Sequence, residues 1–585
     1  MGKTIIQKIF ENHSDQKANV GDIIDIDIDV RAARDFGGAN VVKNLEENNL
    51  SIDDFRKTFF TFDCNPGGCD QKYAANQQIC RIYARRNNIK VFDIDSGIGT
   101  HLVIDEKIAK PGGTIVSTDS HANILGAIGA FGQGMGDKDI AHAWAYGKIW
   151  FKVPPTVKII LKGKPSNLAT PKDVILRLLK EFGANGLLGY AAEIYGEYVD
   201  NLTLDGRITI ASMATEMGAI IILFPDKEGM IADSDAFYEK SFEIDIKDLK
   251  PMISRPGHPE DVVKVDDIKN EKVDSGFIGS CTNGRMDDMR RVARILKGRK
   301  IAPGRVLKIV PSTDKIWQKC LDEGIINIFK QAGALVGSAG CAGCAAGQIG
   351  QTGSGEVAVS SGNRNFLGKQ GKGDIYLASP ETVAASLVAG FVTSIEDIPD
   401  KPESVKIEKN QIYKSKTIVK TAKQPLKVEG KVWVIKKDNI DTDMIFHNRY
   451  LSITNIDEMG QYTFDNLKGY EDFAKEAKPG DILIVGKNFG CGSSRQQAVD
   501  CFKSLGISLI IAESFGAIYE RNAINSAMPI LISDDITSKI KNNDKLFIDF
   551  TTGEIKDITQ NKTYQCKPFS KSQLEIYNRK GLLNI

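Results

Sequence analysis

Three cysteines in two glycine-rich stretches constrain this chain more than any other feature of its sequence. Cys281 lies in the stretch Gly-Ser-Cys-Thr-Asn-Gly-Arg at residues 279–285, and Cys341 and Cys344 form a Cys-x2-Cys pair further along. Iron-sulfur clusters are held by cysteine thiolates, and a full set of four leaves no iron vacant. On a cubane cluster, three thiolates would leave one iron open to bind a substrate hydroxyl and carboxylate as a Lewis acid. The count therefore favours hydro-lyase chemistry over electron transfer.

The Cys-x2-Cys pair has two simpler interpretations, half of a zinc site or a redox pair. The sequence contains no second Cys-x2-Cys that would complete a four-cysteine zinc site. Small residues also surround all three thiols, and glycine lets backbone amides approach a bulky inorganic core. A zinc or redox protein that uses only this pair stays an alternative at the level of sequence.

Length and charge limit the class of protein. A chain of 585 residues is too long for one hydrophobic core and predicts about three or four domains. A net charge of +1 gives no reason to expect nucleic acid or an anionic membrane as a partner. No apolar run reaches the ~18 residues of a membrane span, and no signal-peptide core follows the N-terminus. Ten cysteines without a dense framework fit a reducing compartment, so we expect a cytoplasmic protein.

Short apolar runs alternate with amphipathic helical patterns from the N-terminus to residue 398. Candidate strands lie at 90–94, 114–117, 157–161, 220–224 and 306–310, and candidate helices at 172–182 and 207–217. This alternation predicts an α/β fold with parallel sheets that are covered on both faces. Active residues in such sheets gather at the carboxyl ends of the strands.

The pattern changes between residues 399 and 427, where three prolines and scattered lysines replace the apolar periodicity. This composition predicts an exposed linker. Further candidate strands follow at 432–436, 482–485, 509–512, 530–533 and 546–550. We therefore expect a catalytic body of three α/β subdomains at 1–398, a linker at 399–427 and a mobile domain at 428–585.

Five motifs, in order along the chain, resemble the aconitase superfamily of dehydratase-isomerases. They are Thr-Asp-Ser-His at 118–121, residues 279–285, the Cys341/Cys344 pair, Asn-Arg-Asn-Phe at 363–366 and Gly-Cys-Gly-Ser-Ser-Arg at 490–495. Residues 279–285 and 438–443 are most similar to the isopropylmalate isomerase and homoaconitase branch, whose large and small subunits would be fused here. The resemblance implies a [4Fe-4S] cluster on Cys281, Cys341 and Cys344, with three α/β domains around it and a C-terminal swivel domain.

The resemblance also implies the activity, the removal of water from a hydroxy-di- or tricarboxylate, often with re-addition at the neighbouring carbon. Citrate or isocitrate, isopropylmalate and homocitrate are the candidate substrates. Ser452 stands at a loop position where the branch would have arginine for an extra carboxylate or an apolar residue for an alkyl group. Serine fits neither, so we expect an uncommon substrate or a citrate-like one that other residues recognise.

Ser493 is the catalytic base that the resemblance implies, because this serine takes the proton from the carbon next to a carboxylate. It stands in a glycine-rich turn after a candidate strand, where a helix should begin. Backbone N–H groups and the helix dipole would stabilise negative charge there. A helix N-cap is the commoner role of a serine in such a turn, but the surrounding motifs favour the base.

A second group of side chains is implied to bind the substrate. These side chains are Ser120, Arg364, Lys369, Arg449, Ser494 and Arg495. The planar fork of arginine suits bidentate binding of carboxylates, although a surface ion pair is the default role of any single arginine. Lys369 stands where the family normally has a second arginine, and a point charge there weakens the expected grip.

A third group is implied to order waters, substrate and proton relays. Its members are Asp63, Cys64, His101, Asp119, His121 and Glu193. Cys64 departs from the family, which has histidine at this position as the donor to the leaving hydroxyl. A thiol has a pKa of about 8.5 against about 6.5 for imidazole, so it donates less readily near neutral pH. Either Cys64 or His101 would then serve as the acid, or the iron-bound hydroxyl would leave with the help of water. Cys64 would otherwise contact the cluster or simply be a buried thiol.

A different class of function stays open as well. Some members of the superfamily lose the cluster and bind RNA, but the balanced charge and the three intact cysteines argue against this. We expect a small polycarboxylate as the partner, no nucleic acid and no membrane, and a monomer or small homo-oligomer.

Overall fold

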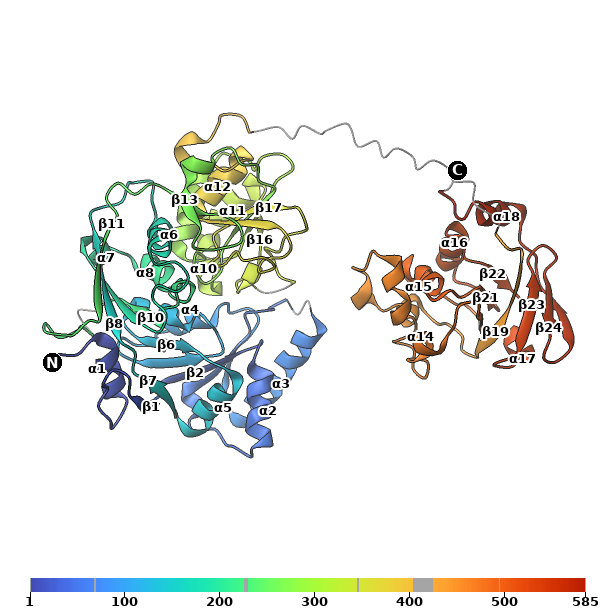
Figure 1. The fold of residues 1–585 in the computed structure, drawn as a ribbon, viewed down its shortest axis with the longest axis horizontal. Helices are drawn as coiled ribbons and strands as arrows, with labels where there is room; N and C mark the ends of the chain where they lie inside the picture. Colours follow the sequence, from blue (N-terminus) through green and yellow to red (C-terminus); the bar gives the residue numbers. More distant parts are fainter. Residues whose placement is uncertain are drawn as a thin grey trace. The chain divides into compact units, whose positions relative to one another are not determined.

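The computed structural model of the chain describes residues 2–67, 70–225, 230–344, 347–402, 424–493 and 495–583. The chain divides into two compact units, Met1–Glu408 and Lys409–Ile585. In Figure 1 the first is coloured from blue to yellow and the second from orange to red. Both units contain parallel sheets with helices, so the predicted α/β class is confirmed. Of the predicted linker, residues 403–423 lie outside the described residues, and strand β19 already begins at Lys427.

The first sheet of the first unit is wholly parallel. Its order is β4 (Lys90–Phe92), β3 (Thr58–Thr61), β2 (Val30–Arg34), β5 (Thr114–Ser117) and β6 (Phe131–Gly134). The chain runs from β2 outward to β3 and β4 and then returns to β5 on the other side. The point between β2 and β5 is therefore a topological switch point, where open α/β sheets bind their ligands.

Two different layers cover this sheet. On one face lie α2 (Gly38–Glu47), α3 (Gln71–Asn87) and α5 (Asp137–Tyr146), which share a core with α1 (Ile5–Asn12) and the antiparallel pair β1 (Ile23–Asp27) and β7 (Lys148–Lys152). On the opposite face lies a second hydrophobic core, which contains α4 (Gly99–Asp105) and the 3-10 helix η2 (Ala122–Ile128). Helix η2 is thus the element that joins the first sheet to the second.

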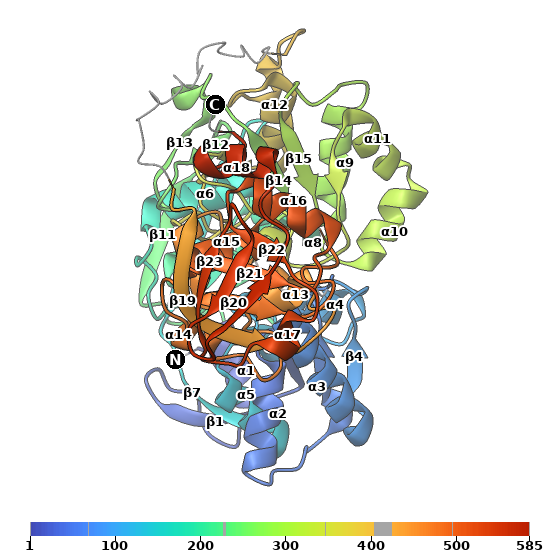
Figure 2. The same cartoon turned by 90° about the vertical axis from the view of Figure 1, so that its right-hand side faces the viewer.

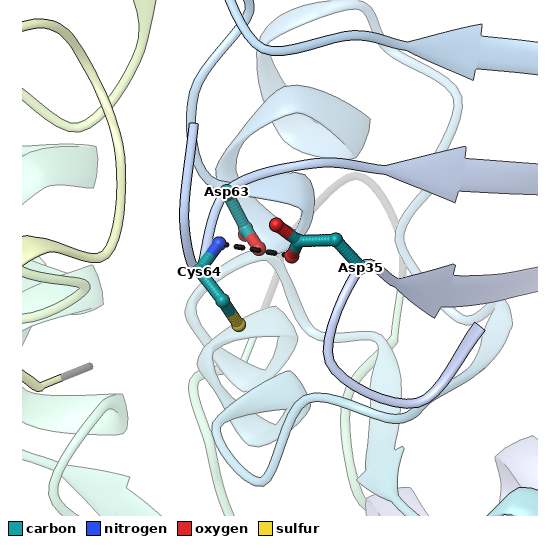
Figure 3. Close-up of side chains that lie close together, drawn as sticks. All are labelled: Asp35, Asp63 and Cys64. Carbon is teal, nitrogen blue, oxygen red and sulfur yellow. Dashed lines mark hydrogen bonds between the residues drawn. The ribbon is translucent and has the colours of Figure 1, made fainter. Parts of the chain in front are cut away.

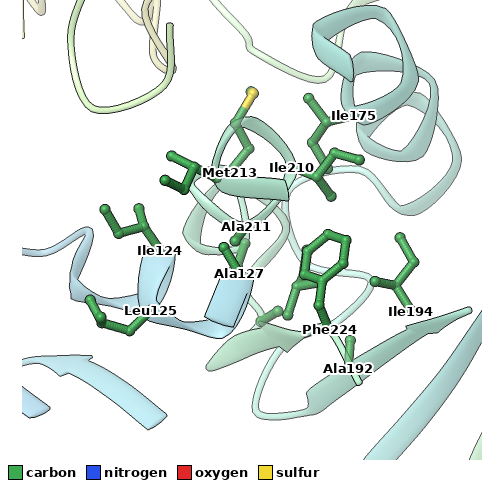
Figure 4. Close-up of a cluster of buried hydrophobic side chains, with 14 of the residues drawn as sticks. Ile124, Leu125, Ala127, Ile175, Ala192, Ile194, Ile210, Ala211, Met213 and Phe224 are labelled. Carbon is green, nitrogen blue, oxygen red and sulfur yellow. The ribbon is translucent and has the colours of Figure 1, made fainter. Parts of the chain in front are cut away.

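The second sheet is parallel in the order β10 (Ile221–Leu223), β9 (Ala191–Tyr195), β8 (Thr156–Lys162) and β11 (Lys240–Asp245). Figure 4 shows Ile124 of η2, Ile210 of α8 and Ala192 of β9 in one buried cluster. Gly126 makes this approach possible, because a Cβ atom there would lie 2.0 Å from the carbonyl oxygen of Ile222.

The helices of this layer are α6 (Pro171–Phe182), α7 (Glu197–Asp200) and α8 (Leu204–Ala211). The helix expected at 207–217 is broken. Helix α8 ends at Ala211, and a separate 3-10 turn, η3, covers Thr215–Met217. The hydroxyl of Ser212 donates to the carbonyl of Thr209 at 2.8 Å, a local bond that competes with helix continuation.

The third sheet has the order β13 (Val262–Lys264), β12 (Met252–Ser254), β18 (Asp374–Ala378), β17 (Val357–Ser360), β14 (Ser275–Ile278), β15 (Val306–Ile309) and β16 (Leu335–Val336). The last five strands are parallel, so the loops that follow β14, β16 and β17 leave from the same edge. Its helices are α9 (Met286–Leu296), α10 (Asp314–Asp322), α11 (Ile325–Ala332) and α12 (Pro380–Ala389).

The second unit has one mixed sheet in the order β22 (Ile530–Ile532), β21 (Leu509–Ala512), β20 (Ile482–Val485), β19 (Lys427–Ile435), β23 (Lys545–Asp549), β24 (Glu554–Asp557) and β25 (Lys562–Gln565). Strands β19 to β22 are parallel and the rest are antiparallel, and Figure 2 shows β20, β21 and β22 side by side. Its helices are α13 (Thr442–Ile445), α14 (Phe473–Glu476), α15 (Gln497–Leu505), α16 (Ala517–Asn525), α17 (Ile536–Lys539) and α18 (Lys571–Asn578). In the part of the chain that the structure describes, no helix combines the length and the apolar character needed to cross a membrane.

Candidate active site

Arg34 connects the carboxyl ends of three strands at the switch point of the first sheet. It is the last residue of β2, its Nε donates to Asp63 Oδ1 at 2.6 Å, and its Nη1 lies 3.1 Å from Asp119 Oδ1. Asp63 follows β3 and Asp119 follows β5, so parallel register brings both carboxylates to one arginine. All three side chains are buried. The sequence reasoning missed Arg34, which nevertheless holds two predicted site residues together.

The two carboxylates have opposite pKa shifts. Burial, together with repulsion from Asp35 and Asp119, raises the pKa of Asp63 to about 6 against the opposing charge of Arg34. Burial also acts to raise the pKa of Asp119, but Arg34 and His121 hold it below its usual value. Asp119 is therefore the carboxylate that ionises first, and Asp63 loses its proton only as the pH rises through about 6.

Arg34 also has a donor that no described residue accepts. Its Nη2 atom is buried and makes no hydrogen bond within the described part of the chain. The charge of the guanidinium also interacts with Cys64 and Cys341. A buried donor without a partner costs free energy, so this atom would gain from a bound anion.

Cys64 lies in a buried turn beside two carboxylates, as Figure 3 shows. Its backbone N–H donates to Asp35 Oδ1 at 3.0 Å, and the ligand atoms of Asp35, Asp63 and Cys64 lie within 4.8 Å of one another. Such spacing suits a cation, but the other oxygen of Asp35 accepts two further hydrogen bonds and Arg34 lies against Asp63. The trio is better explained as a hydrogen-bonded turn. Burial raises the pKa of the Cys64 thiol well above its usual value, so the thiol keeps its proton.

His121 joins the first sheet to residues from the other two. Its Nε2 lies 3.3 Å from Glu216 Oε1 and 2.6 Å from the side-chain nitrogen of Asn363. Asn363 Nδ2 also lies 3.6 Å from Cys281 Sγ, and Arg364 Nε donates to Glu216 Oε1 at 2.7 Å. These five side chains, which we call the His121 network, connect a predicted cluster ligand to a predicted substrate-binding arginine.

Electrostatics reinforce the His121 network. Burial alone would lower the pKa of His121, but Cys281 and Glu216 hold it well above its usual value. Burial would raise the pKa of Glu216, but His121 and Arg364 hold it below its usual value. The charges of Cys281 and Glu216 therefore favour the protonated form of His121, and those of His121 and Arg364 favour the ionised form of Glu216. Glu216 was also missed from the sequence, although Asn363 and Arg364 stand in the motif at 363–366.

His101 lies against the backbone of a predicted cluster ligand. Its Nε2 is 3.0 Å from the carbonyl oxygen of Cys281, so this nitrogen carries the proton of a neutral ring. Burial and the nearby charge of Arg285 lower the pKa of His101 to about 4. Its Nδ1 is buried and has no partner among the described residues. His101 is thus a neutral ring with an available acceptor nitrogen.

The three predicted cluster ligands follow parallel strands of the third sheet. Cys281 is buried after β14, and Cys341, after β16, is half-buried and donates its backbone N–H to the carbonyl oxygen of Asp63 at 2.8 Å. Cys344 ends the 3-10 turn η5 (Ala342–Cys344), and its side chain lies outside the described residues. Ser280 and Ala342 both have positive φ angles, 69° and 51°, which residues with a Cβ atom seldom adopt.

This donor set fits an anionic iron-sulfur cluster. The side-chain amide of Asn363 lies against Cys281, and the unpartnered Nη2 of Arg34 belongs to a guanidinium whose charge interacts with Cys341. N–H donors and buried positive charge around thiolates are what a cluster with net negative charge requires.

Glu193 is not brought together with the other predicted residues. Its Oε1 accepts a hydrogen bond from the backbone of Ile5 at 2.6 Å, and its Oε2 accepts from the hydroxyls of Tyr195 at 2.5 Å and Tyr238 at 2.6 Å. The side chain therefore ties helix α1 to strand β9, and Glu216 is the glutamate of the second layer that contacts His121.

Apart from Arg364, the predicted substrate-binding residues of the first unit are Ser120, which contacts the His121 network, and Lys369. Ser120 is exposed, its hydroxyl lies 3.3 Å from His121 Nδ1, and it lines a polar pocket of about 360 Å³ with Thr215. Lys369 is half-buried, and its backbone N–H donates to the carbonyl of Phe366 at 3.0 Å.

In the second unit, Ser493 is exposed in the turn before helix α15. The carbonyl oxygen of Ser493 accepts a hydrogen bond from the Thr442 hydroxyl at 3.1 Å, and the preceding Gly492 has a φ of 96°. The helix begins only at Gln497, so Ser493 is not its N-cap residue. Ser494 lies outside the described residues.

The two arginines of this unit differ in burial. Arg495 is buried and pairs with Asp443, with Nη1 at 2.5 Å from Oδ1 and Nη2 at 2.6 Å from Oδ2. Arg449 is half exposed, 3.8 Å from Asp465, and its guanidinium lies 5.1 Å from the centre of the Tyr450 ring. Arg495 is therefore neutralised within its own unit, whereas Arg449 is accessible.

Comparisons with known proteins cover both units. The sequence profile of the Aconitase family (aconitate hydratase) matches residues 7–232 and 226–390, and that of the Aconitase C-terminal domain matches 422–535. The mitochondrial homoaconitase of Candida albicans is 30% identical over 612 aligned positions, 94% of this chain and 89% of that protein. The 3-isopropylmalate dehydratase large subunit 1 of Thermotoga maritima is 35% identical over 413 positions, 67% of this chain and 99% of that subunit. The homoaconitase large subunit of Thermus thermophilus is 34% identical over 414 positions, 68% of this chain and 99% of that subunit.

Proposed function

This chain belongs to the aconitase family of hydro-lyases, and from that premise we propose that it dehydrates, and rehydrates, a hydroxy-di- or tricarboxylic acid with the help of a [4Fe-4S] cluster. Citrate or isocitrate, isopropylmalate and homocitrate are the candidate substrates. The observation that carries the proposal is the His121 network, in which Asn363 contacts Cys281 while Glu216 holds Arg364.

Cys281, Cys341 and Cys344 would hold the cluster, which supplies an open Lewis-acid iron for the substrate hydroxyl when it is bound. The protein provides the positive surroundings for this assembly. Arg34 is a buried cation whose charge interacts with Cys64 and Cys341, and Cys281 and Glu216 favour the charged form of His121. Buried cations oriented in advance lower the cost of placing thiolates and a polycarboxylate together.

Arg364 is the first group that we assign to substrate binding. Glu216 accepts from its Nε, and among the described residues its two terminal nitrogens make no further hydrogen bond. They are the two donors of a bidentate contact with a carboxylate. The Nη2 of Arg34 is a further donor for an anionic oxygen, and Ser120, Lys369, Arg449, Ser494 and Arg495 complete the proposed binding set.

Proton transfer is assigned to residues of both units. Ser493 is proposed as the base that removes the proton next to a carboxylate, which its exposure in a glycine-rich turn supports. Burial raises the pKa of the Cys64 thiol well above its usual value, so the thiol keeps its proton near neutral pH, cannot act as a base and is a weaker acid than an exposed thiol. His101 is a neutral ring whose Nδ1 can accept a hydrogen bond, and its lowered pKa of about 4 makes it a weak base near neutral pH. Asp63, Asp119 and His121 would order waters and the substrate, and Glu193 has no such role in this proposal.

Ten cysteines without a disulfide framework favour a reducing compartment such as the cytoplasm, although the Candida albicans relative is mitochondrial. The partner is a small polycarboxylate.

The test is anaerobic reconstitution followed by metal analysis and a substrate panel. We expect about four irons per chain and enoate absorbance that rises with at least one of citrate, isocitrate, homocitrate, isopropylmalate, citramalate or malate. Zinc in place of iron would support the zinc or redox interpretation instead. Iron without turnover of any member of the panel, together with sub-micromolar RNA binding by the apo form, would support the RNA-binding alternative.

A further inference from the structure

A lysine is completely buried in the first unit, in the first turn of helix α6. The ammonium of Lys172 donates to the carbonyl oxygens of Gly362 at 2.6 Å and Ser361 at 3.3 Å, and to the sulfur of Met213 at 3.3 Å. These contacts use all three donors of the group. Lys172 forms no ion pair with any residue that the structure describes. Lysine is almost never fully buried without a paired charge, so its position calls for a reason other than stability.

The acceptors of Lys172 form the turn that precedes the active-site motif of the third sheet. Ser361 and Gly362 follow strand β17, and the next two residues are Asn363 and Arg364. Asn363 contacts His121 and Cys281, and Arg364 is held by Glu216. The ammonium therefore fixes two carbonyl groups directly before Asn363 and Arg364, two of the residues that the third sheet contributes to the His121 network.

The opposite side of the turn is fixed by the loop of Cys281. The hydroxyl of Ser361 accepts a hydrogen bond from the backbone N–H of Gly279 at 3.0 Å. Ser361 is thus held from one side by the loop of a cluster ligand and from the other by Lys172. A change at Lys172 would be transmitted to Asn363 through one or two peptide units.

The start of helix α6 is itself anchored to the third sheet. Asp173, the next residue, accepts the backbone N–H of Met252 at 2.7 Å, and Met252 begins β12. The same carboxylate accepts from the backbone and hydroxyl of the N-cap residue Thr170. These hydrogen bonds hold the start of helix α6 against the third sheet. We therefore expect Lys172 to keep its position even if the turn at residues 361–362 moves.

We propose that Lys172 is a positioning residue of the active site, whose buried ammonium clamps the turn at residues 361–362 and thereby sets the direction of Asn363 and Arg364. The role of these two side chains in turnover rests on the proposed function, but the clamp itself does not. Burial lowers the pKa of Lys172 to about 8, while the nearby charges of Glu216 and Cys281 oppose that change, so the ammonium persists at neutral pH.

The first experiment measures the clamp without turnover. Hydrogen exchange of peptides that cover residues 357–370 is compared in the apo forms of wild type, Lys172→Met and Lys172→Arg. We expect exchange at 361–364 to rise about tenfold or more in the Met variant and to be partly restored in the Arg variant, which keeps the donors. Lys300→Met is the matched control, because Lys300 also donates to a backbone carbonyl, that of Gln331 at 2.6 Å, but at the surface.

The second experiment is a double-mutant cycle in the reconstituted enzyme. Lys172→Met should keep the iron content and lose about 100-fold in kcat/KM, the size expected when a site group is displaced by about 1 Å. Because Lys172 acts through Asn363, Lys172→Met combined with Asn363→Ala should lose far less than the product of the two single losses. Lys300→Met should keep the wild-type rate.

Three results would overturn the clamp: unchanged exchange at 361–364 in Lys172→Met, an equal rise in Lys300→Met, or strictly multiplicative losses in the cycle. If the Met variant does not fold, Lys172→Gln, which keeps two donors, takes its place in both experiments with the same expectations. Raised exchange together with the absence of turnover by wild type on every substrate would reject the proposed function and leave the clamp standing.

Discussion

The polar residues of the first unit and those of the second are organised in opposite ways. In the first unit, Arg34 bonds two carboxylates, and the His121 network links side chains from three sheets in a buried setting. In the second unit, Ser493 is exposed, and the contact described for it is made by its carbonyl oxygen. In the first unit, hydrogen bonds between side chains hold the polar groups in place. In the second unit, a hydrogen bond to the backbone of Ser493 holds the residue and leaves its hydroxyl exposed.

The difference predicts how each region responds to change. Buried, mutually bonded groups are oriented in advance and couple strongly, so the loss of one disturbs its neighbours. An exposed hydroxyl that makes no hydrogen bond to any described residue, as at Ser493, can be removed without disturbing the fold. Substitutions in the first region should therefore affect structure and activity together, and the substitution of Ser493 should affect activity alone.

The largest effect is expected for Ser493→Ala. If Ser493 is the base, its loss should lower kcat by about 10³-fold, within the range for general acid–base groups. The cluster content and the melting temperature should stay at wild-type values, because the hydroxyl is exposed. Iron analysis, calorimetry and steady-state kinetics measure the three quantities. Ser538→Ala, at an exposed serine of the same unit, is the control, and near-wild-type turnover by Ser493→Ala would remove the base assignment.

A somewhat smaller effect is expected for Glu216→Gln. The amide keeps the size of the side chain but loses the charge that pairs with His121 and Arg364, so we expect about a 10²-fold loss in kcat/KM and a lower melting temperature. Glu193→Gln is the matched control, a buried glutamate that contacts Ile5, Tyr195 and Tyr238 instead. It should lower the melting temperature but change kcat/KM by less than about threefold. Equal losses of activity in the two variants would erase the distinction between these glutamates.

The sequence could predict those features that depend on short-range pattern and on parallel register. The alternation of apolar runs and helices predicted the α/β class, and most candidate strands coincide with observed ones, such as 114–117 with β5 and 482–485 with β20. Residues directly after these strands, Asp119 among them, could be placed at a sheet edge for the same reason. The comparisons confirm the family that the ordered motifs indicated.

The residues that the sequence did not reveal are those whose role depends on long-range contacts. Strand β2 has the sequence Val-Arg-Ala-Ala-Arg and is buried along its whole length. Because two of its five residues are arginines, it does not form an apolar run, and neither the strand nor the role of Arg34 could be predicted from the pattern. Glu216 lies in a stretch expected to be one helix, and the break after Ala211 depends on a bond of Ser212 that periodicity does not show. Pattern alone could not distinguish Glu193 from Glu216, because both are single acids in apolar surroundings.

The smallest effect is expected at the ion pair of the second region. The hydrogen bonds from Arg495 lower the pKa of Asp443. Partial burial acts to raise it but is the weaker effect, so the pKa lies below its usual value. A carboxylate with a lowered folded pKa stabilises the fold above the unfolded pKa of about 3.9, and this contribution disappears as pH falls through the folded pKa. Hydrogen exchange of helix α13 and of residues 495–505 should therefore be faster in Asp443→Asn than in wild type at pH 6, and the difference should shrink as the pH falls below the unfolded pKa. Because Asp443 is partly exposed, we expect the difference at pH 6 to correspond to about 0.5 kcal/mol or less.

Asp472→Asn, at a surface pair with Lys475 in the same unit, is the control for general charge effects. A loss of turnover as large as that of Glu216→Gln would show that this region, too, is a coupled network, and the contrast between the two units would fail.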